Sequence, residues 1–164
     1  MSRFVLPCLL FLMGCQSATP PAETPPSTPG EVRWAEVTNT VELLTLAAGA
    51  AAEGKALVLD VRADWCVPCR ELERETFADE AVERALAEGF VLGRLDVTDA
   101  SPSAEALQRT VGGTTLPCVA LWPMNQSEAA AFASGEVPPP AKTVSTFVSA
   151  QEFLPTLKAV RAGE

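Results

Sequence analysis

One segment constrains the fold of this chain more than any other: an apolar run that leads into two cysteines three positions apart. Residues 56–61 (ALVLDV) are bounded by Gly54 and have the continuous apolar character of a β-strand buried on both faces. Cys66-Val67-Pro68-Cys69 follows after four residues. A C-x-x-C sequence that comes after a buried strand and opens a helix is typical of a redox-active dithiol.

The position of the two cysteines on a first helical turn predicts different roles for them. Unpaired backbone N–H groups and the helix dipole stabilise a thiolate on the first sulfur. We therefore expect Cys66 to attack a partner disulfide and Cys69, lying deeper, to resolve the mixed disulfide. The alternatives are a structural disulfide or half of a zinc site. Zinc needs four ligands, and the chain offers no histidine and only Cys118 besides this pair in the folded part.

The absence of histidine and the acidic composition exclude several functional classes. Without histidine the chain lacks the commonest general base at neutral pH and any histidine-assisted serine or cysteine nucleophile. Its formal net charge of −9 repels the phosphates of nucleic acid, so we expect no nucleic acid partner. We also expect no resident metal and no cofactor.

The first 30 residues predict a secretory signal followed by an extended tether. Residues 1–14 hold a ten-residue apolar run, too short for a bilayer span of about 20 residues but suited to a secretory signal. Leu12-Met13-Gly14-Cys15 resembles the lipobox of bacterial lipoproteins, which implies cleavage before Cys15 and lipidation of its sulfur. A plain signal or an uncleaved anchor is the alternative. Residues 15–30 are proline-rich and predict an extended tether that carries a domain formed by residues 31–164.

The remaining patterns predict an α/β domain with the element order β-α-β-α-β-α-β-β-α. The charged run at residues 70–75 is interpreted as a solvated helix face. Residues 123–141 read as a loop with one helical turn at 128–133. The predicted strands cover residues 32–37, 56–61, 90–97, 116–122 and 142–148, and the predicted helices cover 40–52, 66–88 with a break near 78–79, 101–110, and a last helix capped by Ser149 and Glu152.

Trp65-Cys66-Val67-Pro68-Cys69 is close to the signature of the thioredoxin superfamily, which residues 32–162 also resemble in element order. The resemblance implies a thioredoxin-like α/β fold with a central mixed sheet flanked by helices. It implies that Asp60, six residues before Cys66, is buried beneath the disulfide and assists proton transfer with Cys69. Burial would raise the pKa of that carboxyl. Arg94 falls where the family often places a basic partner of the carboxylate.

The same resemblance predicts the surface that binds the partner chain. Leu116-Pro117 falls where the family keeps a cis-proline, which grips the partner through backbone contacts. Trp65, Val67 and Pro68 would flank the disulfide on the other side. Cys118, which directly follows Pro117, is interpreted first as a buried thiol and alternatively as a third redox thiol or a metal ligand.

In several short stretches of its sequence, the domain is similar to the C-terminal periplasmic domain of DsbD-type electron transporters. The dipeptide Val67-Pro68 is similar to that of TlpA-type reductases. This implies a protein-disulfide reductase of the cell envelope, periplasmic or otherwise extracytoplasmic, that is anchored by lipid to a membrane, with the outer membrane as a candidate. Its substrates would be disulfide-containing envelope proteins or cytochrome c precursors during maturation. A membrane electron donor of the DsbD/CcdA type would recharge it. The alternatives are a disulfide oxidase or isomerase, and a Cu(I) metallochaperone using Cys66, Cys69 and Cys118.

Overall fold

A computed structural model describes residues 32–163 of the chain. The predicted signal (residues 1–14), the predicted lipidation site Cys15 and the proline-rich stretch to residue 30 lie outside the described residues.

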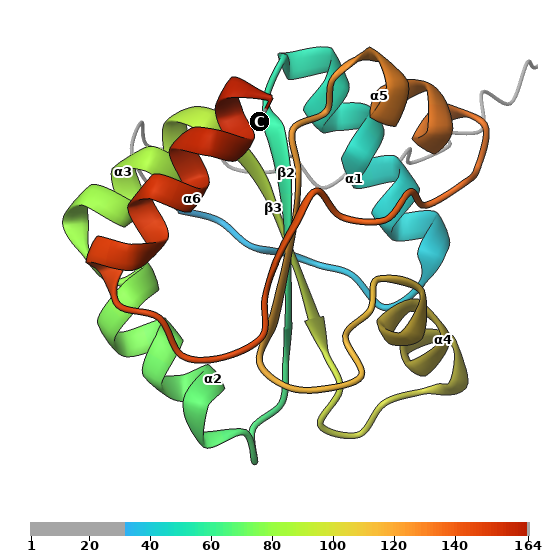
Figure 1. The fold of residues 1–164 in the computed structure, drawn as a ribbon. Coiled ribbons are helices and arrows are strands. Elements are labelled where there is room, and N and C mark those ends of the chain that lie inside the picture. The colour runs from blue at the N-terminus through green and yellow to red at the C-terminus, as the bar shows by residue number, and fades with distance from the viewer. Residues whose placement is uncertain (1–31, 164) are drawn as a thin grey trace, which may run out of the picture.

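A five-stranded mixed sheet with helices on both faces forms the fold (Figure 1). The strand order is β1-β3-β2-β4-β5, with β1, β3 and β2 parallel and β4 and β5 antiparallel to their neighbours. This confirms the predicted fold class. The strands are β1 (Ala35–Glu36), β2 (Ala56–Arg62), β3 (Phe90–Asp96), β4 (Cys118–Trp122) and β5 (Lys142–Val144).

Seven helical segments connect and cover these strands, and their ends follow the capping residues seen in the sequence. The side chain of Asn39 accepts a hydrogen bond at the start of the first helix, and Gly54, with φ 63°, ends it. Asp79 caps the third α-helix at the predicted break. The helices are α1 (Thr40–Glu53), α2 (Val67–Glu71), η1 (Leu72–Phe77), α3 (Glu80–Gly89), α4 (Pro102–Thr110), α5 (Gln126–Ala133) and α6 (Ala150–Ala162).

Three predicted elements differ clearly in length from those observed. The first strand, expected at residues 32–37, is the two-residue β1 (Ala35–Glu36). The turn expected at residues 128–133 is a full helix, α5, because the side chain of Asn125 caps it and Glu128 bonds back to the Asn125 N–H. The strand expected at 142–148 ends at Val144. Phe147 and Val148 leave the sheet edge and pack with the buried side chains of η1, α3 and α6, which accounts for their apolar character.

The sheet separates two clusters of buried side chains. Leu57, Leu59 and Val61 of β2 point into the cluster shared with α1, α4 and α5. Val58 of the same strand points into the cluster shared with η1, α3 and α6. The run at residues 56–61 is therefore buried on both faces, as its continuous apolar pattern predicts, and it carries its carboxyl end directly into the cysteine motif.

Candidate active site

The two cysteines of the motif form a disulfide at the start of a helical segment. Cys66 is the N-cap residue of α2 and Cys69 lies in its first turn, with their Cα atoms 5.3 Å apart. The backbone N–H of Cys69 donates a hydrogen bond to Cys66 Sγ at 3.2 Å. Both cysteines are nearly covered, at 4% and 2% exposed. When the pair is reduced, the N–H donor and the helix start stabilise a thiolate on Cys66.

Asp60 is a buried carboxylate two residues before the end of β2, with 2% of its surface exposed. Burial raises its pKa from 3.8 to about 6, and the Arg94 guanidinium opposes this rise while the Glu73 carboxylate adds to it. A carboxyl group with such a pKa can both accept and donate a proton near neutral pH. The structure places Asp60 on the strand that leads into the motif, in the buried position that the resemblance implied.

Arg94 is the basic partner of Asp60. The two residues are cross-strand neighbours in the β2–β3 register, and Arg94 Nε lies 3.3 Å from Asp60 Oδ2. The guanidinium also reaches Glu73, with Nη2 3.3 Å from Oε1. Arg94 thus holds two carboxylates, that of Asp60, which is buried, and that of Glu73, which is partly exposed.

Glu73 is the site residue that the sequence interpretation missed. Residues 70–75 were expected to form a solvated helix face, and this is wrong for Glu73, whose carboxylate points at the sheet. Its Oε1 lies 3.3 Å from Arg62 Nε as well, a contact without the alignment of a hydrogen bond. The signal for this position was its spacing: Glu73 comes four residues after Cys69, which places both on one side of the helical segment.

Arg62 extends this cluster along the end of β2. Its Nη1 lies 3.1 Å from Asp96 Oδ2 and its Nη2 2.7 Å from Asp64 Oδ1. Burial lowers the pKa of Arg62, but the carboxylates of Glu73, Asp64 and Asp96 raise it by more, so its charge is fixed. The cluster therefore runs without a gap from the buried Asp60, through the two arginines and Glu73, to solvent-facing Asp64.

An exposed apolar surface flanks the disulfide. Trp65 is 64% exposed and Val67 is 54% exposed, whereas Pro68 is half-buried. The Leu116–Pro117 peptide bond is cis, as the resemblance implied, with Leu116 half-buried and Pro117 buried. Because β4 runs antiparallel to β2 with Cys118 opposite Val61, Pro117 comes at the same end of the sheet as the motif.

Cys118 is a free, buried thiol. Its surroundings raise its pKa from 9.0 to about 11, chiefly by burial and secondarily through the Asp60 carboxylate. Within residues 32–163, no three histidine, cysteine, aspartate or glutamate side chains are grouped so that they could hold a metal ion. The three-thiol Cu(I) site that the sequence left open is thus not formed in this structure.

The described part of the chain contains no helix with the length and apolar character needed to cross a bilayer.

Comparisons with known proteins relate the chain to thioredoxin-like proteins and to DsbD. A family model described as thioredoxin-like matches residues 45–123. The chain is 36% identical to the thiol:disulfide interchange protein DsbD of Vibrio cholerae over 124 residues, which are 76% of this chain and 19% of that protein. DsbD of Yersinia enterocolitica is 38% identical over 112 residues, or 68% of this chain and 18% of that protein. The chain thus spans about a fifth of the length of the curated relatives it matches.

Solved structures show the same relationship at the level of one domain. The oxidised C-terminal domain of DsbD from Neisseria meningitidis aligns with a TM-score of 0.58 and 27% identity, covering 79% of this chain and 100% of that one. A thioredoxin from Thermus thermophilus aligns with a TM-score of 0.59 and 19% identity, covering 81% of this chain and 95% of that one. The second likeness concerns the fold alone.

Proposed function

Because the chain carries a thioredoxin-superfamily domain that resembles the C-terminal domain of DsbD, we propose that it is a thiol–disulfide oxidoreductase that reduces disulfides in proteins outside the cytoplasm. The observation that carries this proposal is the Cys66–Cys69 disulfide at a helix start, with the buried Asp60 on the strand that leads into it. A structural disulfide would have no use for a buried carboxyl group whose pKa lies near neutral pH.

In the proposed reaction, the reduced protein supplies two electrons and the substrate disulfide accepts them. The Cys66 thiolate attacks one substrate sulfur, which forms a mixed disulfide and releases the other substrate sulfur as a thiolate. Asp60 in its ionised form takes the proton of Cys69, and the Cys69 thiolate then attacks Cys66 Sγ. The protein disulfide closes and the second substrate sulfur leaves. The proton held by Asp60 is returned to solvent or to a leaving thiolate.

The proposed substrate surface consists of the apolar residues around the disulfide. Trp65 and Val67 stand out from the domain, and such exposed apolar side chains suit contact with an unfolded or extended partner segment. The cis Leu116–Pro117 peptide would supply backbone contacts from the other side of the motif, and the half-buried Pro68 would belong to the same surface. This arrangement admits many envelope proteins, including cytochrome c precursors whose haem-attachment cysteines must be reduced.

The proposed location is the bacterial envelope, in keeping with the resemblance to the periplasmic domain of DsbD-type transporters; the matched relatives carry the name thiol:disulfide interchange protein DsbD. Residues 1–14 would be a signal peptide, Cys15 the lipidated residue, residues 15–30 a tether, and residues 31–164 the redox domain. A lipid anchor would keep the domain near its membrane electron donor of the DsbD/CcdA type, which would reduce the Cys66–Cys69 disulfide after each turnover.

Two measurements test the proposal. Replacing Cys66 by serine (Cys66→Ser) should abolish the reduction of insulin disulfides, whereas the matched control Cys118→Ala should keep the wild-type rate. A Cys66→Ser protein that reduces insulin at that rate would rule the mechanism out.

The reduction potential of the Cys66–Cys69 couple, measured in glutathione buffers, decides the direction of electron flow. A value of roughly −270 mV indicates a reductase, and a value of roughly −120 mV indicates an oxidase in its place.

A further inference from the structure

Arg94 is held by an aromatic ring as well as by its two carboxylates. The ring belongs to Trp34, which comes just before β1, and Arg94 Cζ lies 4.9 Å from its centroid. The face of an indole attracts a guanidinium electrostatically, and the attraction is stronger where water is partly excluded. Arg94, with one fifth of its side chain exposed, meets that condition.

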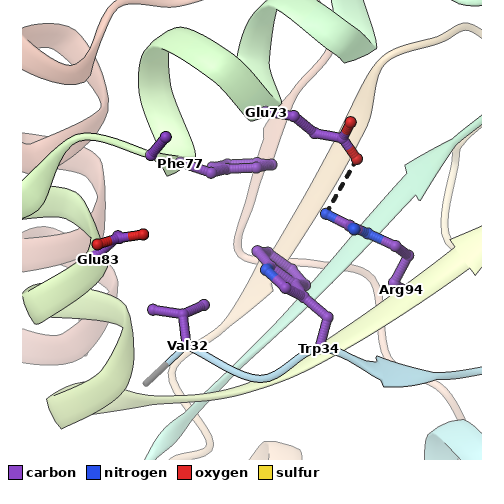
Figure 2. A pocket seen from close by; sticks show the side chains of 7 residues that line it. Val32, Trp34, Glu73, Phe77, Glu83 and Arg94 are labelled. Carbon is purple, nitrogen blue, oxygen red and sulfur yellow. Dashed lines mark ion pairs between the residues drawn. The ribbon is translucent and has the colours of Figure 1, made fainter. Parts of the chain in front are cut away.

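The indole that touches Arg94 is itself fixed in place. Its ring centroid lies 5.2 Å from that of Phe77, and Phe77 in turn lies 5.8 Å from Phe153 of the buried cluster. Figure 2 shows the indole between Arg94 and the side chains of Phe77 and Val32. It therefore forms a firm wall against which the long arginine side chain rests.

A third carboxylate lines the same cavity as the guanidinium. A cavity of about 290 Å³ beside the indole is lined by Arg94, Glu73 and also Glu83 (Figure 2). Among the ion pairs of the described residues, Arg94 takes part in those with Asp60 and Glu73, and Glu83 takes part in none. An arginine side chain is flexible enough to turn toward a third carboxylate, so a contact that favours the Asp60 side decides where its charge lies.

We propose that Trp34 is a positioning residue for the redox site, whose ring keeps the Arg94 guanidinium against the Asp60 carboxylate. The inference rests on the proposed proton-transfer role of Asp60 and adds a residue 32 positions before the motif. Trp34 touches no reacting atom and acts through Arg94 alone.

The charged groups around Asp60 fix the direction of the expected effect. Asp60 faces Arg94 from β3, Glu73 from η1 and Arg62 on its own strand, and its charge also acts on the Cys118 thiol of β4, which lies on the other side of the sheet. Of the two arginines, Arg94 is the one with the stronger influence on the Asp60 pKa. If its guanidinium turns away, burial and the Glu73 carboxylate act with less opposition, and both favour the neutral acid. Loss of the indole should therefore raise the pH at which Asp60 titrates.

The test is a titration of the Asp60 carboxyl carbon by NMR in the oxidised, ¹³C-aspartate-labelled protein. Wild type should show a midpoint near pH 6. Trp34→Leu, which keeps an apolar cover but removes the aromatic face, should move the midpoint up by about one pH unit. Trp34→Phe should give a smaller rise and covers the case in which the leucine variant does not fold. Val32→Ala is the matched control, because Val32 lines the same cavity but can form neither an ion pair nor a ring contact with Arg94, and it should leave the midpoint unchanged.

A double variant separates positioning from a general loss of structure. In an Arg94→Gln background, Trp34→Leu should cause no further shift, because its route to Asp60 is already removed. An unchanged or lowered midpoint in Trp34→Leu, or an equal extra shift in the Arg94→Gln background, would overturn the inference. The titration needs no turnover, so its failure is distinguishable from a failure of the insulin test on Cys66→Ser.

Discussion

The two faces of the central strand β2 differ in character along its length. On the side of α1, which we call the α1 face, Leu57, Leu59 and Val61 are apolar and completely buried from one end to the other. On the side of α3, the α3 face, Val58 is followed by Asp60 and then Arg62. One face of the strand is thus apolar along its whole length, whereas the other changes from apolar to charged side chains toward the dithiol.

β3 repeats the change beside it: on the α3 face Leu92 is followed by Arg94 and Asp96, in register with the residues of β2. Burying charge costs free energy unless each group is paired. Collecting these groups at the carboxyl ends of both strands lets them pair with one another and places the perturbed carboxyl where proton transfer is needed. On these two strands the α1 face has no such groups and is expected to supply stability, whereas the α3 face is expected to supply proton transfer to the dithiol, whose cysteines pack in the α1-side cluster.

Leu59→Ala tests the α1 face and should have the largest effect. Leu59 of β2 is fully buried on the side of α1, so its truncation should lower the free energy of unfolding by about 2–5 kcal/mol, measured by urea denaturation. The Asp60 titration should stay where it is, because Leu59 points to the opposite face. Val41→Ala, at an exposed position of α1, is the control and should cost less than about 0.5 kcal/mol. A moved Asp60 midpoint in Leu59→Ala would break the division between the faces.

Asp60→Asn tests the α3 face through the pH dependence of the free energy of unfolding. The folded pKa of about 6 lies above the ordinary 3.8, so the folded state binds the proton more tightly than the unfolded chain does. Wild type should therefore lose up to about 3 kcal/mol of unfolding free energy relative to Asp60→Asn as pH rises from 4 to above 6, and no more beyond. Urea unfolding of the oxidised proteins across that range measures the difference. A difference that does not change with pH would mean that Asp60 titrates alike in both states.

The contrast between the faces also explains what could be predicted from the sequence. The continuous apolar run at 56–61 predicts burial on both faces, and the spacing of the two cysteines predicts the dithiol. Both predictions succeed because these features depend on residues that are close in the chain. The charge cluster depends on the β2–β3 register, which brings residues 34 positions apart into contact. Arg94 therefore entered only through a family resemblance, and Glu73 looked like one more polar residue on a solvated helix. Trp34 had no local signal at all.

Cys118→Ala is the smallest of these perturbations and asks whether a thiol on the α1 face belongs to the chemistry. Cys118 packs in the α1-face cluster beside the dithiol, so losing its sulfur should cost about 1–2 kcal/mol of unfolding free energy and leave the rate of insulin reduction unchanged. In the reduced native protein, iodoacetamide should modify Cys66 first and Cys118 far more slowly. A pKa of about 11 keeps the buried Cys118 thiol protonated at pH 8, whereas the Cys66 sulfur has the N–H of Cys69 as donor. Labelling of both at one rate, or slower reduction by Cys118→Ala, would place Cys118 among the reacting groups, and the α1 face of the strands would then no longer serve stability alone.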